Sequence, residues 1–400
     1  DASVTDHRTR ALKLLAFAML VALGNGSLAS YPPGGGHWSW FLQYPLGLRA
    51  LGHQVFWLEL LKASGDRERD LALIRDFFGR IRTYDLEDCC AVLLLENPDI
   101  QDLERAETFG MTRPEISRRI ADADLLWSLS SAIREPLLSR FRRRVLIDTD
   151  PGHLQVSALS WDLGINRHDA FLTVGTKIHD SDCEIPTLGV RWRPFLPFVY
   201  LPLWERSQSP PASAPITSIT QWTWEELPYE GRMLSASKRT AYLRYAQLPR
   251  LSGRAFELAA NIGADDPAGD RAALKAGGWT IVEAHAVAAT PEDYRGYIRR
   301  SRAEILCPKP IYRELRTGWF SDRSACYLAS GRPVIAEETG FSERVATGRG
   351  LVSFSDMAGA IEAVREIDAD YAAHSDAARA LACEFFDSAK CLSAMLDASA

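Results

Sequence analysis

The stretch "TGWFSDRSACYLASGRPVIAEETGFSE", residues 317–343, indicates how the chain folds. Its first part predicts a short helix at 321–330, because Ser321 suits the position before a helix and Gly331 follows its end. Its second part predicts a strand at 332–338 that ends in another glycine loop. A helix followed at once by an apolar strand is typical of a parallel α/β sheet. The first amides of a helix lack intrahelical partners and carry partial positive charge, so this helix start predicts a binding site for an anion.

Strand-like and helix-like segments alternate over the rest of the chain. A segment rich in proline and serine, residues 201–218, interrupts the alternation and is the best candidate for a linker. We therefore predict two parallel α/β domains, at 1–205 and 216–380, joined by a hinge at 206–215. The expected strands are 14–23, 54–60, 91–96, 125–130, 144–148, 170–175, 216–222, 279–287, 303–309, 332–338 and 350–355, and the expected helices include 37–51, 252–260, 291–301 and 321–330.

Length and charge limit the class of protein. The chain has 400 residues, and two domains of about 200 residues each are the natural expectation. Its net charge is −6 and acidic and basic residues are mixed along it, whereas a nucleic-acid-binding protein has a concentrated basic face. No segment approaches the ~20 consecutive apolar residues that span a bilayer. We therefore expect no nucleic-acid partner and no stable membrane insertion.

The cysteines and the N-terminal region bear on localisation. The seven cysteines are scattered and lack the spacing of a zinc site, which predicts reduced thiols in a cytoplasmic protein. A second interpretation is that Arg8, Arg10 and Lys13, the apolar run at 14–24 and "SLAS" at 27–30 form a signal peptide. A buried first strand explains the same run, because a glycine loop and an amphipathic helix follow it directly. The sequence leaves both interpretations open.

Several segments resemble one enzyme superfamily. The segment "LASGRPVIAEETGFSE" (328–343) resembles the donor-binding half of the GT-B glycosyltransferases. Residues 220–239 and 318–335 are similar to a group of bacterial glycosyltransferase-like proteins, and 386–396 is similar to the closing helix of those chains. The likeness covers about 215–396 and is weaker over 11–205.

The resemblance implies a fold and an activity. In the GT-B fold two Rossmann-like parallel-sheet domains face each other across a cleft, and here a closing helix at about 380–400 would pack back on the first domain. The C-terminal domain would bind a nucleoside-diphosphate sugar, and the N-terminal domain would bind a small-molecule or glycan acceptor. The implied reaction is transfer of a hexosyl group to an acceptor hydroxyl, with no metal and no cofactor besides the nucleotide-sugar co-substrate. Cys326 stands where retaining members usually carry a ribose-binding glutamate, so the retaining or inverting outcome stays open.

The second domain supplies the candidates for the donor site. Amides near Arg323 would hold the diphosphate, while Asp322 would bind a sugar or ribose hydroxyl or simply cap the helix. Lys238 and Lys309 are candidates for neutralising the diphosphate, with solvated surface lysines as the alternative. Trp222 would stack on the base or pack against the hinge. The full set of donor candidates is Trp222, Lys238, Lys309, Thr317, Gly318, Ser321, Asp322, Arg323, Ser324, Thr339 and Gly340.

The first domain supplies the candidates for the acceptor site and the catalytic base. The loop "YPPGGGHW" (31–38) carries His37, which corresponds to the general base of inverting GT-B enzymes and has an ordinary pKa of about 6.5. A structural histidine at a helix start is the alternative. Asp150, which follows the strand 144–148, is the other candidate base. The acceptor-binding candidates are Gly35, Gly36 and Trp38.

Three further motifs favour structural interpretations. "GNGSLA" (24–29) matches a dinucleotide-binding turn, but the prolines and glycines that follow prevent a helix from starting there. Asp148 and Asp150 match a metal-binding Asp-x-Asp, yet they lie in the half assigned to the acceptor. The acids and histidine of 179–184 fit a solvated loop. We therefore predict no metal site.

Two other functions remain as alternatives. A nucleotide-sugar epimerase would have the same two domains and would need no acceptor. A non-catalytic protein that binds nucleotide-sugars would have the donor site alone.

Overall fold

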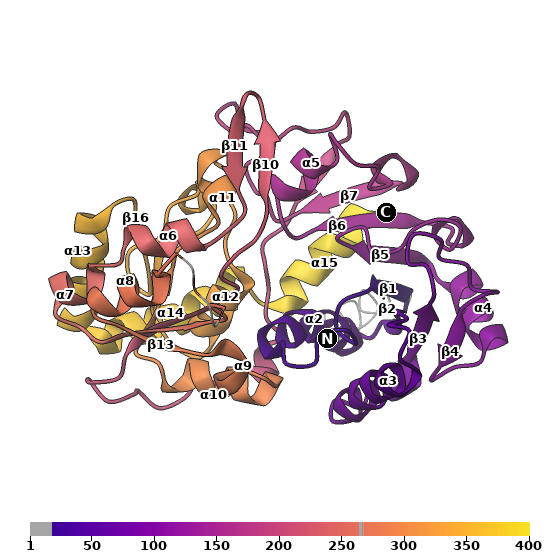
Figure 1. Cartoon of the computed structure of the whole chain (residues 1–400), viewed down its shortest axis with the longest axis horizontal. Coiled ribbons are helices and arrows are strands. Elements are labelled where there is room, and N and C mark those ends of the chain that lie inside the picture. Colours follow the sequence, from indigo (N-terminus) through magenta and orange to yellow (C-terminus); the bar gives the residue numbers. More distant parts are fainter. Residues whose placement is uncertain (1–17, 264–265, 267) are drawn as a thin grey trace, which may run out of the picture.

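The computed structural model describes residues 18–263, 266 and 268–400, and in it the chain forms two α/β domains that lie next to each other (Figure 1). The N-terminal domain, in indigo to magenta, contains an eight-stranded sheet of order β4-β3-β2-β1-β5-β6-β7-β8. The C-terminal domain, in rose to yellow, contains a six-stranded sheet of order β13-β12-β9-β14-β15-β16. All neighbouring strands of both sheets run parallel except β3 and β4.

The N-terminal sheet has its first strand at the centre. Strand β1 pairs with β2 on one side and with β5 on the other, so its apolar residues are buried on both faces. The strands are β1 (Leu20–Asn25), β2 (Gln54–Lys62), β3 (Cys90–Leu95), β4 (Glu107–Phe109), β5 (Leu125–Leu129), β6 (Arg144–Asp148), β7 (Ala170–Thr173) and β8 (Trp192–Pro194). The α-helices are α2 (Gly35–Ala50), α3 (Arg67–Arg82), α4 (Arg113–Asp122) and α5 (His153–Ser157).

The C-terminal domain repeats this architecture and adds a hairpin. The antiparallel hairpin of β10 (Glu226–Tyr229) and β11 (Arg232–Ser235) leaves the sheet and reaches the N-terminal domain near α5 (Figure 1). The sheet strands are β9 (Ile216–Thr220), β12 (Phe256–Ala260), β13 (Trp279–Val282), β14 (Ala303–Leu306), β15 (Val334–Glu337) and β16 (Leu351–Phe354). The helices are α6 (Arg239–Arg244), α7 (Leu248–Ser252), α8 (Asp270–Ala276), α9 (Ala284–Val287), α10 (Pro291–Arg300), α11 (Pro310–Glu314), α12 (Asp322–Ala329), α13 (Met357–Ala369), α14 (Tyr371–Phe385) and α15 (Ser388–Ser399).

Two sequence-based assignments in this domain were wrong. The expected helix at 252–260 is the strand β12, because its apolar residues pair with β9 and β13, and sheet packing overrides the helix propensity of Leu and Ala in so short a run. The expected strand at 279–287 ends at Val282 and gives way to the short helix α9.

The expected first strand at 14–23 lies partly outside the described residues. Its described part begins β1 at Leu20 and continues to Asn25, two residues past the predicted end. Arg8, Arg10 and Lys13, on which the signal-peptide interpretation depends, lie outside the described residues. Among the described residues, no helix combines the length and the apolar character that crossing a bilayer requires.

The last helix of the chain returns to the N-terminal domain. Helix α15 packs against α2, where the Leu392 side chain fills the space above Gly47. The indole nitrogen of Trp127 in β5 donates a hydrogen bond to Ser399 Oγ at 2.9 Å. The chain therefore crosses between the domains twice, once at 205–215 and once before α15.

The domains contact each other on two sides. On one side the buried Lys177 pairs with Asp182 of its own loop and with Glu343 of the other domain, while Thr176 Oγ1 donates a hydrogen bond to the Gly318 carbonyl. On the other side the Gly35 amide donates a hydrogen bond to the Ala288 carbonyl at 3.1 Å. These contacts fix how the two sheets face each other.

At Gly35 the backbones of the two domains approach each other closely. A Cβ atom on this residue would lie 2.2 Å from the Thr290 carbonyl oxygen, which is far inside van der Waals contact. Because both partners are backbone, neither can move aside without shifting a domain. The position therefore requires glycine.

The substitution Gly35→Ala tests this contact. We expect it to lower the free energy of unfolding by ~1–3 kcal/mol, the usual cost of overpacking a tight contact. The matched control is Gly79→Ala in α3, where a Cβ meets nothing within 4 Å and a gain of about 0.5–1 kcal/mol is expected. Urea unfolding of both variants measures the difference, and equal midpoints would show that the domains do not meet at Gly35.

Candidate functional site

A cleft of about 980 Å³ lies between the two domains at the carboxyl ends of their strands. Its N-terminal wall includes residues that follow β1, β5 and β6, and its C-terminal wall includes residues that follow β9 and β12, together with the start of α12. In parallel α/β sheets this edge is the usual place for ligands. The cleft is therefore the candidate functional site.

The start of helix α12 forms part of the C-terminal wall. Ser321 precedes the helix and its hydroxyl accepts a hydrogen bond from the Arg323 amide at 3.2 Å, which is the cap that the sequence predicts. Ser321, Asp322 and Arg323 all line the cleft. The first-turn amides and the positive end of the helix dipole are thus next to the open space.

Lys238 is a cleft residue without a counter-ion. Among the described residues no carboxylate lies within 4 Å of its ammonium group, and Nζ lies 5.7 Å from the centre of the Trp319 ring. Burial, followed by the positive charges of Arg323 and Lys309, lowers the pKa of Lys238 to about 7. A cation in this position gains most from an anionic ligand.

Arg323 is held in place by its own domain. Its Nε donates to Glu304 Oε1 at 2.5 Å and its Nη1 donates to the Ile219 carbonyl at 2.7 Å. Although burial lowers the pKa of Arg323, the charge of Glu304 outweighs it and raises the pKa above its ordinary value. Arg323 is thus a fixed positive charge below the cleft. Its removal would leave Glu304 buried without a partner, so it is a poor residue for testing ligand binding.

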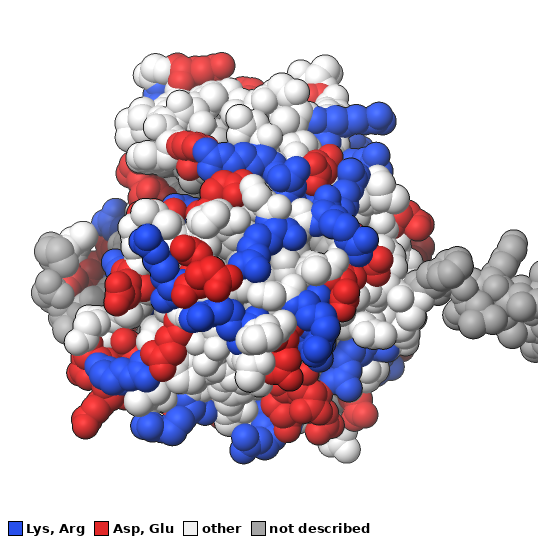
Figure 2. Space-filling model, turned by 90° about the vertical axis from the view of Figure 1, so that its right-hand side faces the viewer, with Lys and Arg blue, Asp and Glu red and all other residues white. Residues whose placement is uncertain are grey.

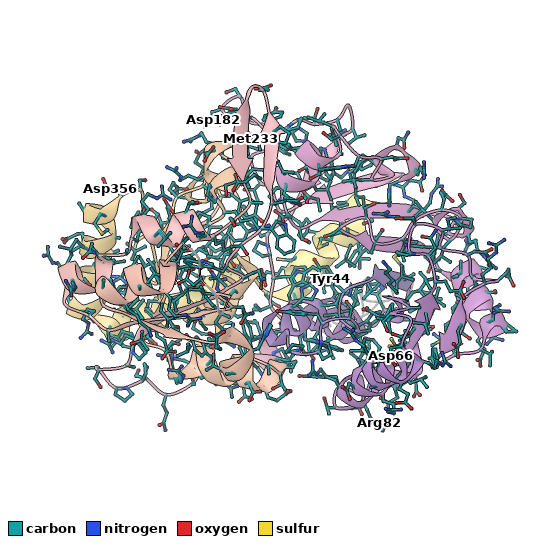
Figure 3. All side chains as sticks on the ribbon, viewed as in Figure 1. Tyr44, Asp66, Arg82, Asp182, Met233 and Asp356 are labelled. Carbon is teal, nitrogen blue, oxygen red and sulfur yellow. The ribbon has the colours of Figure 1, made fainter. Side chains whose placement is uncertain are left out.

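Asp322 faces the cleft without a basic partner. No Lys or Arg nitrogen in the described part of the chain lies within 4 Å of its carboxylate, and burial raises its pKa. The side chain also borders a second, small cavity that is lined by Trp319, Tyr44 and other aromatic residues. Figure 3 shows Tyr44 near the middle of the molecule, between the two domains. Asp322 is therefore positioned to accept hydrogen bonds from a ligand.

His37 lies in the first turn of α2 and faces the cleft. Its ring stacks on Trp40, and its Nε2 lies 2.6 Å from Ser27 Oγ. Burial lowers the pKa of His37 to about 4, so the imidazole is neutral at pH 7. A neutral imidazole has one nitrogen that donates and one that accepts, and the neighbours of Ser27 decide which is which.

A chain of hydrogen bonds orients His37. The Glu59 carboxylate only accepts, so the Asn25 amide group donates to it at 3.0 Å and turns its oxygen towards Ser27. The Ser27 hydroxyl donates to that oxygen at 3.2 Å, which leaves its own oxygen to accept from His37 Nε2–H. Nδ1 is then the nitrogen of His37 that can take up a proton.

Glu59 also holds the loop that carries this chain of hydrogen bonds. It accepts the amides of Leu28 and Ala29 at 2.7 and 2.9 Å and the Trp57 indole N–H at 3.1 Å. Burial raises the pKa of Glu59 to about 6 despite these donors. The glycine motif that resembled a dinucleotide turn therefore forms a loop that hydrogen bonds to Glu59 hold in place.

Asp150 and Lys309 are placed elsewhere than the sequence suggested. The two side chains pair with each other across the domain boundary, and Asp150 also accepts a hydrogen bond from Tyr312 at 2.6 Å. Burial alone would raise the pKa of Asp150, but Lys309 and the other partners hold it below its ordinary value. Neither residue lines the cleft. Asp150 is thus an interdomain ion-pair partner and not a free base.

The remaining predicted residues divide into cleft, loop and core positions. Gly35 and Gly36 line the cleft at the start of α2. Trp222 and Trp38 are buried in the cores of their domains, and Trp224, which is 54% exposed, lines the cleft in place of Trp222. The other five donor candidates do not line the cleft: Thr317, Gly318, Ser324, Thr339 and Gly340. All of them except Ser324 form hydrogen bonds within or between the loops beside α12.

Sequence reasoning missed several cleft residues. Asn25 ends β1 and Ser27 lies in the loop that follows, and these polar side chains beside Gly26 were a signal that sequence reasoning overlooked. Tyr31 and His285 pair across the cleft from opposite domains, and their separation in sequence gave no sign of this contact. Trp319 was also missed, because its side chain carries no charge and its only cue in the sequence is its position just before α12.

Both carboxylates of the Asp-x-Asp motif form contacts within the protein. Asp148 is buried and accepts hydrogen bonds from Thr173 Oγ1 at 2.6 Å and Gln155 Nε2 at 2.8 Å, while Asp150 pairs with Lys309. No group of three or more His, Cys, Asp or Glu side chains within the described ranges has the arrangement of a metal site.

Comparison with solved structures identifies the fold. An α-glucosyltransferase (AGT) in complex with UDP superposes with a TM-score of 0.58 and 12% identity, over 95% of this chain and 99% of that one. Anabaena Alr3699/HepE, solved with UDP and glucose, gives 0.54 and 13% over 95% and 98% of the two chains. Sucrose-phosphate synthase from Thermosynechococcus elongatus gives 0.52 and 12% over 95% and 98%. The predicted GT-B fold of two Rossmann-like domains is confirmed.

Comparisons at the sequence level add nothing to this. No family model matches the chain, and no curated protein matches it.

The state of His37 gives a prediction that can be checked by NMR. We expect the imidazole to be neutral at pH 7, with the proton on Nε2, and to titrate at about pH 4 because burial disfavours its charged form. Long-range ¹H–¹⁵N spectra report both properties, and His37→Gln assigns the signal. Ser27→Ala should mix the two tautomers, whereas an Nδ1–H tautomer in the unmodified protein would overturn the hydrogen-bond chain.

Proposed function

We propose that the protein transfers a hexosyl group from a nucleoside-diphosphate sugar to an acceptor hydroxyl. The observation that carries this proposal is Lys238, a half-buried cation that has no carboxylate within 4 Å among the described residues and lies in the same cleft as the start of α12. The structures of the α-glucosyltransferase and of HepE, which share the fold, contain UDP, and this supports a nucleotide-sugar as the ligand.

The diphosphate is assigned to the C-terminal wall. Lys238 supplies a movable positive charge, the first-turn amides of α12 supply hydrogen-bond donors, and Arg323 supplies a fixed positive charge behind them. As the bond between the sugar and the diphosphate breaks, negative charge grows on the leaving phosphate oxygen. These groups stabilise that charge, which is the main contribution that the protein makes to the reaction.

The donor sugar is assigned to the space between Asp322 and His37. The Asp322 carboxylate has no basic partner in the described part of the chain and accepts hydrogen bonds from sugar hydroxyls. The acceptor hydroxyl approaches from the N-terminal wall, where His37 Nδ1 takes its proton. Because its pKa is about 4, His37 stays in the proton-accepting form over the whole neutral range.

The domain contacts support a reaction that excludes water. The Lys177 cluster and the Gly35–Ala288 hydrogen bond join the domains on both sides of the cleft. Because these contacts hold the donor and acceptor walls in place, substrates that fill the cleft leave little room for the water that would hydrolyse the donor.

The charge state of Lys238 makes donor binding depend on pH. Its pKa is about 7 in the free protein, and a bound diphosphate raises it, so binding above pH 7 takes up a proton. We expect the affinity for UDP-glucose to fall as pH rises from 7 to 9, by up to tenfold per pH unit. UDP-glucose suits this test because a terminal phosphate has a second ionisation near pH 6, and the diphosphate of UDP-glucose has no terminal phosphate.

Calorimetry in buffers of different ionisation enthalpy measures the proton uptake directly. Lys238→Met should weaken binding at least tenfold at pH 7 and abolish the uptake. The control Lys275→Met changes an exposed lysine of the same domain and should leave both unchanged. Binding with equal affinity in both variants would remove Lys238 from the donor site.

Incubation with a panel of nucleotide-sugars tests the activity itself. We expect slow hydrolysis of one donor without an acceptor and faster release of nucleoside diphosphate when an acceptor is present. Altered sugar stereochemistry with no transfer would indicate an epimerase. Binding without any turnover would indicate a non-catalytic protein, and either result would contradict the proposal.

A further inference from the structure

The groups that hydrogen-bond to the Glu59 carboxylate are all donors. Its Oε1 atom accepts the backbone amides of Leu28 and Ala29. Its Oε2 atom accepts the Trp57 indole N–H and one N–H of the Asn25 carboxamide. A backbone N–H or an indole N–H cannot accept a hydrogen bond, whereas a carboxamide carries an acceptor oxygen beside its donor nitrogen. Asn25 is therefore the one of these partners that can change its role.

A protonated Glu59 needs a partner that accepts its new O–H group. Oε1 faces two backbone amides, so the proton goes to Oε2, next to Asn25. Half a turn of the Asn25 carboxamide directs its oxygen at Oε2 and its nitrogen at Ser27. The Ser27 hydroxyl then accepts from Asn25 and donates to His37 Nε2. Nε2 accepts this bond only without its own proton, so the imidazole proton moves to Nδ1 by exchange with solvent.

We therefore propose that Glu59 is a positioning residue that decides which nitrogen of His37 accepts a proton. With Glu59 ionised, Nε2 carries the imidazole proton and Nδ1 is the free base. With Glu59 protonated, Nδ1 carries the proton and the lone pair of Nε2 is engaged by Ser27. One proton enters from solvent in this change and stays on Glu59. The effect on catalysis rests on the proposed function, in which His37 is the base, whereas the tautomer change is a property of the free protein.

The surroundings of Glu59 place this change near neutral pH. Figure 2 shows basic and acidic side chains mixed over the outer face of the N-terminal domain, whereas Glu59 is completely buried. No Lys or Arg nitrogen in the described part of the chain lies within 4 Å of its carboxylate. Burial raises the pKa of Glu59 to about 6, because the hydrogen bonds that it accepts offset the lost hydration only in part. Glu59 is thus ionised at pH 8 and mostly protonated at pH 5.

The titratable groups around Glu59 keep their charge in this range. In β3, burial raises the pKa of the Cys90 thiol well above its usual value, and the charge of Glu59 adds to this effect. In α2, His37 stays neutral down to pH 5 because burial lowers its pKa to about 4. In α3, Arg80 donates to a backbone carbonyl of the loop that follows β1 and remains charged. A change in the tautomer of His37 between pH 8 and 5 therefore reports on Glu59.

Long-range ¹H–¹⁵N spectra of the full-length protein test the inference without any substitution. We expect His37 to change from the Nε2–H form at pH 8 to the Nδ1–H form at pH 5, with a midpoint near pH 6. The imidazole should stay neutral throughout this range. A His37 that keeps the Nε2–H form down to pH 5 would overturn the inference.

Glu59→Gln imitates the protonated carboxyl group at every pH. Its amide oxygen still accepts the two backbone amides, and its NH₂ group donates to the Asn25 oxygen. We expect His37 to show the Nδ1–H form from pH 8 to 5. The control Asp148→Asn neutralises another completely buried carboxylate of the same sheet, whose pKa burial also raises to about 6. It should leave the transition near pH 6 in place, and an Nε2–H form in Glu59→Gln would contradict the inference.

Kinetic measurements separate this inference from the proposed function. We expect Glu59→Gln to lower kcat for sugar transfer about tenfold or more at pH 7, with the Kd for UDP-glucose unchanged. In the unmodified protein kcat should fall with an apparent pKa near 6, a range in which Lys238 is already protonated. Reversal of the tautomer without any sugar transfer would support the inference and refute the proposed function. Transfer that falls only near pH 4, with a constant tautomer, would refute the inference and leave the proposed function standing.

Discussion

Lys238, a half-buried lysine with no carboxylate within 4 Å in the described part of the chain, is the feature on which this account of the cleft depends. Desolvation and the neighbouring positive charge of Arg323 both disfavour the protonated form of Lys238. Groups whose pKa is shifted this far cluster at functional sites. The pairing of Arg323 with Glu304 has the opposite character, because it fixes one positive charge permanently below the cleft. In this site Glu304 neutralises Arg323, whereas Lys238 has no such partner. A bound diphosphate would supply the negative charge that Lys238 lacks.

The two domains have different tasks in holding this arrangement. The C-terminal domain builds the charged wall from the start of α12 and from Lys238. The N-terminal domain contributes a neutral histidine, whose orientation depends on the buried Glu59 through Asn25 and Ser27. Contacts between backbone atoms at Gly35 and the Lys177 cluster keep the walls opposed.

The sequence allowed the fold and part of the site to be predicted. The alternation of apolar runs and helices gave the two parallel sheets, and the cap at Ser321 and the position of His37 followed from local patterns. Local patterns did not reveal that Asp150 and Lys309 pair, because the two residues lie 159 positions apart. They also did not separate Trp222 from Trp224, since only the exact end of β9 decides which ring is buried. Contacts over long separations and side-chain direction after a strand are properties of the folded chain.

The most direct measurement is a crystal structure with a bound nucleotide-sugar that is not hydrolysed. The account predicts diphosphate oxygens within hydrogen-bond distance of Lys238 Nζ and of the first-turn amides of α12. It also predicts that the sugar lies between Asp322 and His37. A diphosphate bound at another place in the molecule, with Lys238 still lacking a partner in the cleft, would contradict the account.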